Sequence, residues 1–127
     1  MEFSTYGRHV VVDMWGVQFQ LLNELDTLKK WMAQAVEKAG ATIISVQEKP
    51  FEPQGVTVLF LLSESHFSIH TYPEKGFAAL DCYTCGEAVD PKIAIEEMLI
   101  FLQPETHYMN EMVRGMGEIQ THSLNKK

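Results

Sequence analysis

The run Val56–Leu62, VTVLFLL, and the segments after it restrict most strongly the folds open to this chain. Its β-branched and large apolar side chains favour a buried strand. Two further strand-like segments follow at 67–72 and 77–83, separated by a turn that carries Pro73 and Gly76. Because strands joined by short turns pair antiparallel, the middle of the chain predicts an antiparallel sheet.

Three more strands and two helices complete the predicted order, β-α-β-β-β-β-α-β. Helical spacing of apolar residues predicts one helix over 24–39, with Asn23 as its N-cap. A second helix is expected to begin with Asp90 as N-cap and Pro91 at its first position. The additional strands are expected at 7–15, 42–47 and 106–113.

Single helices placed among hairpin-linked strands indicate an α/β (α+β) sandwich, an antiparallel β-sheet with two helices packed on one face. The 127 residues suit a single domain, 1–127, with one hydrophobic core. The other face of the sheet then needs a cover. A second subunit is the simplest cover, so we expect this fold to dimerise.

Composition and charge disfavour several classes of protein. Ten Lys and Arg residues against 17 Asp and Glu residues give a net charge of −7, which argues against a nucleic-acid partner. No apolar run approaches the roughly 20 residues that a membrane-spanning helix needs. The first residues, MEFST, lack the basic and apolar regions of a secretory signal, so we expect a cytoplasmic protein.

The chain has two cysteines, Cys82 and Cys85, in a C-x-x-C spacing. Two cysteines do not make a disulfide framework, and a lone C-x-x-C is a weak signal for zinc or redox chemistry. On a strand, residues three apart face opposite sides, so the two thiols are not expected to act together. We therefore expect no metal site.

A polar segment, SESHFSIH, directly follows the Val56–Leu62 run and contains Ser65, His66 and His70. Taken alone, it favours a strand end that becomes a polar edge with solvated or hydrogen-bonded histidines. The surrounding residues, LLSESHFSIHTYPE and then GFAALDCYTCG, change this interpretation. Together they resemble the signature of bacterial S-adenosylmethionine decarboxylase proenzymes. Further matching segments are GRH near the start, PQGV, DP, and RGMG near the end.

By this resemblance the chain is a proenzyme that cuts itself. The Ser65 hydroxyl attacks the carbonyl of Glu64, and the bond between them breaks to leave a β chain, 1–64, and an α chain, 65–127. His70 is the implied base in this processing, and Ser65 becomes a pyruvoyl group. Because a hydroxyl is a poor nucleophile at its free pKa, positioning and local strain must activate Ser65.

The same resemblance implies decarboxylation of S-adenosylmethionine, which supplies the aminopropyl donor for spermidine biosynthesis. The pyruvoyl ketone forms a Schiff base with the substrate amine and accepts the electrons released with carbon dioxide. Cys85 is the implied proton donor, which suits a thiol near neutral pH. Phe51 matches an aromatic residue that stacks on adenine, and Glu74 a carboxylate that holds the ribose hydroxyls. From the residues alone, a core-capping Phe51 and a solvated Glu74 remain open.

Four positions near the predicted site depart from the family pattern. Thr57 replaces a serine that assists processing; it keeps the hydroxyl but is stiffer at χ1. Val58 replaces a flexible glycine, Lys49 a histidine and Tyr72 a tryptophan. These departures leave open a pyruvoyl-dependent decarboxylase of ornithine or arginine. A non-catalytic homologue acting as a binding subunit is less consistent with the intact chemical groups, and a zinc or redox protein built on the C-x-x-C is the weakest hypothesis.

The spacing of Ser65 and His70 constrains how the two can meet. Five residues of extended chain span about 16 Å and reverse the side-chain parity. The two side chains therefore cannot touch within one straight strand. In the family, the serine and cysteine of one subunit face the histidine of the other, so we predict that His70 acts in trans across a two-fold homodimer.

Overall fold

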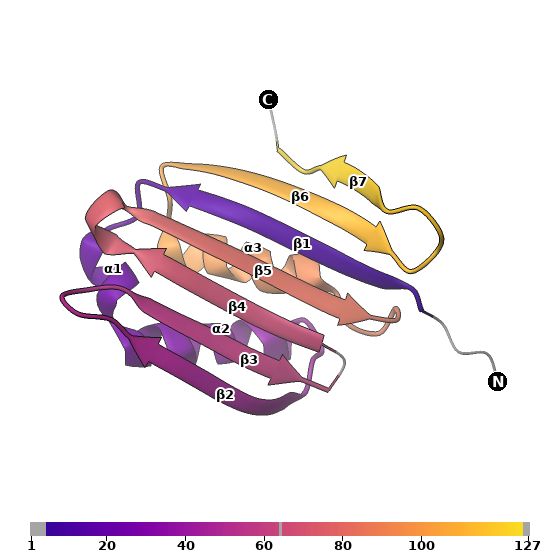
Figure 1. The fold of residues 1–127 in the computed structure, drawn as a ribbon, viewed down its shortest axis with the longest axis horizontal. Coiled ribbons are helices and arrows are strands. Elements are labelled where there is room, and N and C mark those ends of the chain that lie inside the picture. Colours follow the sequence, from indigo (N-terminus) through magenta and orange to yellow (C-terminus); the bar gives the residue numbers. More distant parts are fainter. Residues whose placement is uncertain (1–4, 64, 126–127) are drawn as a thin grey trace.

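The computed structural model describes residues 5–63 and 65–125 (Figure 1). Its strands are β1 (Gly7–Trp15), β2 (Ile43–Pro50), β3 (Val56–Leu62), β4 (Ser65–Tyr72), β5 (Phe77–Cys85), β6 (Thr106–Arg114) and β7 (Gln120–Ser123). They form one sheet in the order β2-β3-β4-β5-β1-β6-β7, and all neighbours in it pair antiparallel. The predicted antiparallel sheet is confirmed, and each of the six predicted strands is present.

The α-helices of the described residues lie on one face of the sheet: α1 (Phe19–Asn23), α2 (Leu25–Lys38) and α3 (Pro91–Leu102) (Figure 1). The longer two are the predicted helices. As expected, the Asp90 side chain accepts a hydrogen bond from the backbone N–H of Lys92 and so caps α3. Trp31 of α2 stacks on Phe101 of α3 with ring centroids 5.1 Å apart. Within the described ranges, no helix is long and apolar enough to cross a membrane.

The hydrophobic core lies between this sheet face and the helices, because side chains alternate along each strand. In β3, Val56, Val58, Phe60 and Leu62 are buried, whereas the side chains between them point to the other face. We call the side away from the helices the open face. It carries large exposed apolar side chains: Trp15, Leu59, Leu61, Tyr72 and Tyr108.

Besides a single 3₁₀ turn at Pro73–Lys75, where a turn was expected, two elements of the described residues were not foreseen from the sequence. The five-residue helix α1 precedes the predicted helix, and the short strand β7 extends the sheet beyond β6. All four residues of β7 are exposed polar side chains, so no apolar alternation marks it. Backbone bonding holds this end in place instead: the Leu124 N–H donates to the Met109 carbonyl at 2.8 Å.

The prediction that Asn23 caps the helix over 24–39 was wrong. The N-cap of α2 is Glu24, which makes no side-chain capping bond. The Asn23 amide oxygen instead accepts a hydrogen bond from the backbone N–H of Gly55 at 2.9 Å. Gly55 has φ of 99°, a conformation that favours glycine, and a Cβ there would lie 3.1 Å from the Thr71 carbonyl. Asn23 therefore ties the helices to the loop between β2 and β3.

Two isoleucines of α3 provide a matched test of this core. Ile95 is fully buried and Ile100 is 60% exposed. We expect Ile95→Ala to lower the free energy of unfolding by about 2–5 kcal/mol, and Ile100→Ala by no more than about 0.5 kcal/mol. Urea unfolding at equal protein concentration, in a Ser65→Ala background that is expected to keep the chain uncut, measures both. Equal losses would contradict the assigned helix orientation.

Candidate active site

Ser65 and His70 lie on the same strand, β4, but on opposite faces of the sheet. Buried Phe67 and Ile69 alternate with His66 and His70, so the polar segment is a strand and not the solvated edge that its composition favours. Ser65 shares the helix side with Phe67, whereas His70 is exposed on the open face. The spacing predicts that Ser65 and His70 do not meet within one chain, and in the structure they lie apart on opposite faces of the sheet.

One end of β4 forms what we call the serine half-site, made of Ser65, Tyr83 and Cys85. Ser65 pairs with Thr84 of β5, and its Oγ is buried without a hydrogen-bond partner among the described residues. Cys85, the last residue of β5, is exposed and lies next to Thr84 in the sequence. The backbones of Ser65 and Cys85 are thus close, but strand parity directs their side chains to different faces. Glu64 lies outside the described residues.

The two cysteines occupy contrasting environments, as their spacing predicts. Cys82 is buried in the core, and burial, with smaller contributions from Asp81 and Asp90, raises its pKa to about 12. Cys85 is free and exposed. A hydrogen bond with Cys85, followed by burial, raises the pKa of Tyr83. Tyr83 was not predicted as part of the site; its position two residues before Cys85 on one strand face is the signal that could have found it.

The other end of β4 forms the histidine half-site, made of Phe51, Thr57, His70 and Glu74. These four residues line one cavity of about 530 Å³ together with Gln54, Gly55, Thr71 and Tyr72. Thr57 Oγ1 and His70 Nδ1 are 3.1 Å apart, because their strands pair at this position. The Gln54 amide donates to Glu74 Oε1 at 3.3 Å. The structure thus brings the predicted substrate-binding residues into one cavity with Thr57 and His70.

The four residues that depart from the family pattern lie on different sides of the sheet and the cavity. Val58 is fully buried on the helix side, so it fills the core and does not face the cavity. Thr57 faces His70 with its hydroxyl within hydrogen-bond distance. Lys49 pairs with Thr57 from β2, and its Nζ lies 6.0 Å from the ring centroid of Phe51, a cation–π distance. Tyr72 lines the cavity and packs near Phe77, with centroids 5.7 Å apart.

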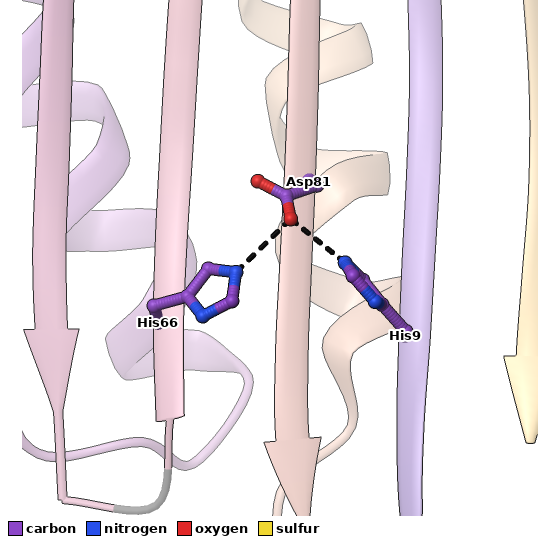
Figure 2. Close-up of side chains that lie close together, drawn as sticks. All are labelled: His9, His66 and Asp81. Carbon is purple, nitrogen blue, oxygen red and sulfur yellow. Dashed lines mark hydrogen bonds and ion pairs between the residues drawn. The ribbon is translucent and has the colours of Figure 1, made fainter. Parts of the chain in front are cut away.

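A third cluster, which was not predicted, lies on the open face (Figure 2). Asp81 of β5 accepts hydrogen bonds from His9 Nε2 of β1 at 2.7 Å and from His66 Nε2 of β4 at 3.0 Å. Ser68 donates to the other Asp81 oxygen. No short sequence spacing relates residues 9, 66 and 81, so only the order of the strands reveals this cluster.

The charge of Asp81 follows from these contacts. Burial by itself would raise the pKa of Asp81, but the hydrogen bonds from His9, Ser68 and His66 together outweigh it and hold the pKa well below its usual range. Asp81 is therefore an ionised acceptor of three hydrogen bonds. Arg114 Nη1 lies 3.2 Å from His9 Nδ1, and its guanidinium carbon lies 4.8 Å from the Tyr83 ring centroid.

The antiparallel sheet with helices on one face defines an α/β sandwich, and comparison with known proteins identifies its family. Residues 8–115 match the sequence profile of the S-adenosylmethionine decarboxylase family. The chain belongs to this family, which confirms the predicted resemblance.

Similar proteins cover nearly the whole chain. The S-adenosylmethionine decarboxylase proenzyme of Brevibacillus brevis is 66% identical over 120 residues, covering 94% of this chain and 90% of that protein. A proenzyme of the same name, numbered 2, from Bacillus cereus is 52% identical over 121 residues, covering 95% and 98%. The crystal structure of the adenosylmethionine decarboxylase of Aquifex aeolicus superposes with a TM-score of 0.79 at 32% identity, covering 93% and 96%.

The contrast between the two thiols can be tested by alkylation. At pH 8 we expect iodoacetamide to modify Cys85 of the native protein at least about tenfold faster than Cys82, because only the thiolate reacts and Cys82 is buried with a raised pKa. Peptide mass mapping over time measures both sites. The Cys85→Ser variant should lose the fast labelling, and equal labelling of Cys82 would contradict the assigned faces of β5.

Proposed function

We propose that this chain is a self-cleaving decarboxylase of S-adenosylmethionine that makes its pyruvoyl group from its own Ser65. The main support is the family match across residues 8–115, because this span contains Ser65, His70 and Cys85 together. Relatives with 66% and 52% identity are named as proenzymes of this activity. They support S-adenosylmethionine over ornithine or arginine as the substrate.

The surroundings of Ser65 fit conversion to a pyruvoyl group. Among the described residues, the buried Ser65 hydroxyl has no hydrogen-bond partner, which is unusual because an unpaired polar group loses its bonds to water. Such a hydroxyl is free to attack the neighbouring carbonyl of Glu64. The proposed cut then leaves a β chain, 1–64, and an α chain, 65–127, within the single domain. When present, a pyruvoyl ketone supplies an electron sink for decarboxylation.

The two half-sites divide the remaining tasks. In the histidine half-site, His70 moves the proton from the Ser65 α-carbon during processing, and the Thr57 hydroxyl fixes the His70 ring at 3.1 Å. In the serine half-site, Cys85 donates the proton that follows loss of carbon dioxide. Once the chain begins at residue 65, this residue can rotate toward the open face, where Cys85 lies.

A homodimer joins a serine half-site to a histidine half-site. Within one chain these lie at opposite ends of β4, about 16 Å apart along the strand. Two-fold packing of open faces brings opposite ends of two sheets together and makes two equal sites. The exposed Trp15, Leu59 and Leu61 on the open face support this cover.

The cavity of the histidine half-site is the proposed place for the nucleoside part of the substrate. Phe51 is exposed and free to stack on adenine, and Glu74 is held by Gln54 in a position to accept hydrogen bonds from ribose. The cavity volume of about 530 Å³ is in the range of small-molecule sites. We place the enzyme in the cytoplasm, without nucleic-acid or membrane partners and without a metal.

Self-cleavage is tested by mass spectrometry of the purified, denatured protein. We expect two fragments, 1–64 and 65–127, the second beginning with a pyruvoyl group in place of Ser65. Ser65→Ala should remain uncut, while Cys85→Ser should be cut but lose roughly 10²–10⁴-fold in kcat, the range of a missing general acid. Carbon dioxide release from S-adenosylmethionine, with ornithine and arginine as controls, identifies the substrate. An unbroken wild-type chain would sink this proposal.

The trans arrangement is tested by mixed subunits. In co-expressed Ser65→Ala and His70→Ala chains, half of the dimers formed at random are mixed, and one site of each mixed dimer is intact. We therefore expect about a quarter of all sites to be cut, whereas each variant alone stays uncut. Densitometry of the separated fragments measures this fraction. No cleavage in the mixture would mean that His70 acts within its own chain.

A further inference from the structure

The carboxylate of Asp81 connects three strands on the open face (Figure 2). It accepts from His9 of β1, and from both His66 and Ser68 of β4. Hydrogen bonds to an ionised acceptor are stronger than those between neutral groups, and Asp81 keeps its charge because its pKa lies well below the usual range. Two of these three bonds act on β4, at its first and third positions after Ser65.

The proposed cut changes what holds the start of β4. In the uncut chain, β4 is joined covalently to β3 through residues 63 and 64. After the cut, β4 begins at a free end, and free strand ends fray. Among the described residues, Ser65 pairs with Thr84 of β5, and the ladder between β4 and β3 begins at the pair of Leu61 and His66. Within the described part of the chain, the strand pairing of residue 65 is therefore with β5.

We propose that Asp81 is a positioning residue that anchors His66 and Ser68, so that the start of β4 stays in register beside Cys85 after self-cleavage. This inference rests on the proposed function. Residue 65 itself remains free to rotate, while the two residues next along the open face are fixed. Such fixing matters because a displacement of about 1 Å between reacting groups can cost on the order of 10² in rate.

The orientation of His9 strengthens the anchor. Arg114 carries only donors, so its contact at 3.2 Å makes His9 Nδ1 an acceptor. His9 Nε2 then carries the proton and donates to Asp81 at 2.7 Å. β1 is the neighbour of β5 on the side away from β4. The bond from His9 therefore holds the Asp81 side chain from the β1 side, opposite the bonds from β4.

His9, His66 and Asp81 are also residue types that bind metal ions. The ligand atoms of His9, His66 and Asp81 lie within 4.8 Å of one another. However, each histidine already directs a nitrogen to Asp81, and the positive Arg114 adjoins His9, which disfavours a further cation. The hydrogen bonds account for the geometry of the three residues, so we favour their role as an anchor. The experiment described below also detects zinc binding.

Amide hydrogen exchange in the cut and uncut forms tests the anchor. In the processed protein, Asp81→Asn should speed exchange of residues 66–68 at least about tenfold, as expected for the loss of a charged hydrogen bond. In the uncut Ser65→Ala background the same change should have less than about a threefold effect, because the continuous chain still holds the strand. Asp13→Asn, at an exposed aspartate of β1 on the same face, is the matched control.

Kinetics and a gentler variant complete the test. Asp81→Asn should lower kcat by about tenfold or more with KM changed less than about threefold, and Ser68→Ala, which leaves Asp81 ionised, should show a smaller effect in the same direction. Equal exchange effects in cut and uncut chains would mean a general structural role and overturn the anchor. So would stoichiometric Zn²⁺ binding that His9→Ala abolishes. Failure of the wild-type chain to cleave would instead remove the proposed function itself.

Discussion

The strict alternation of side chains along β4 is the constraint on which the site depends. Because the helices cover only one face of the sheet, each residue of β4 belongs either to the core or to the open face. This alternation places Ser65 on the helix side and His70 on the open face. It also places His66 and Ser68 where Asp81 can bind both. One strand therefore carries the proposed cleavage residue, its proposed base and the two residues that Asp81 is proposed to anchor, each in its own place on one of the two faces.

The sequence predicted the sheet well because strand signals in this chain are local. β-branched runs and the turn with Pro73 and Gly76 locate β3, β4 and β5. Asp90 and Pro91 locate the start of α3 because capping is also local. β7 was missed because it has no apolar alternation, and the cap of α2 was wrong because Asn23 bonds to Gly55, 32 positions away along the chain. Pairings of this kind arise only when the chain is folded.

The site shows the same division between local and long-range information. Ser65, His70 and Cys85 were named through one contiguous resemblance, and their roles stay predictions, while the structure adds where each of them lies. Thr57 and His70 could be expected to meet once β3 and β4 form a hairpin. The cluster of His9, His66 and Asp81 requires β1 to insert beside β5, which no spacing in the sequence reports. Its partner Arg114 comes from β6 on the far side of β1.

The strand order has a consequence for what the proposed cut does to the molecule. Strands β1, β2 and β3 would belong to one fragment and β4 to β7 to the other, yet β1 lies between β5 and β6. The two fragments would thus be interleaved, and neither could leave without breaking ladders on both sides of β1. Refolding after denaturation would then require two chains to meet, so its rate would depend on concentration, whereas the uncut subunit folds from one chain. The uncut subunit would unfold and refold reversibly. After the proposed cut, the persistence of the fold would depend chiefly on a slow rate of unfolding, which is kinetic stability.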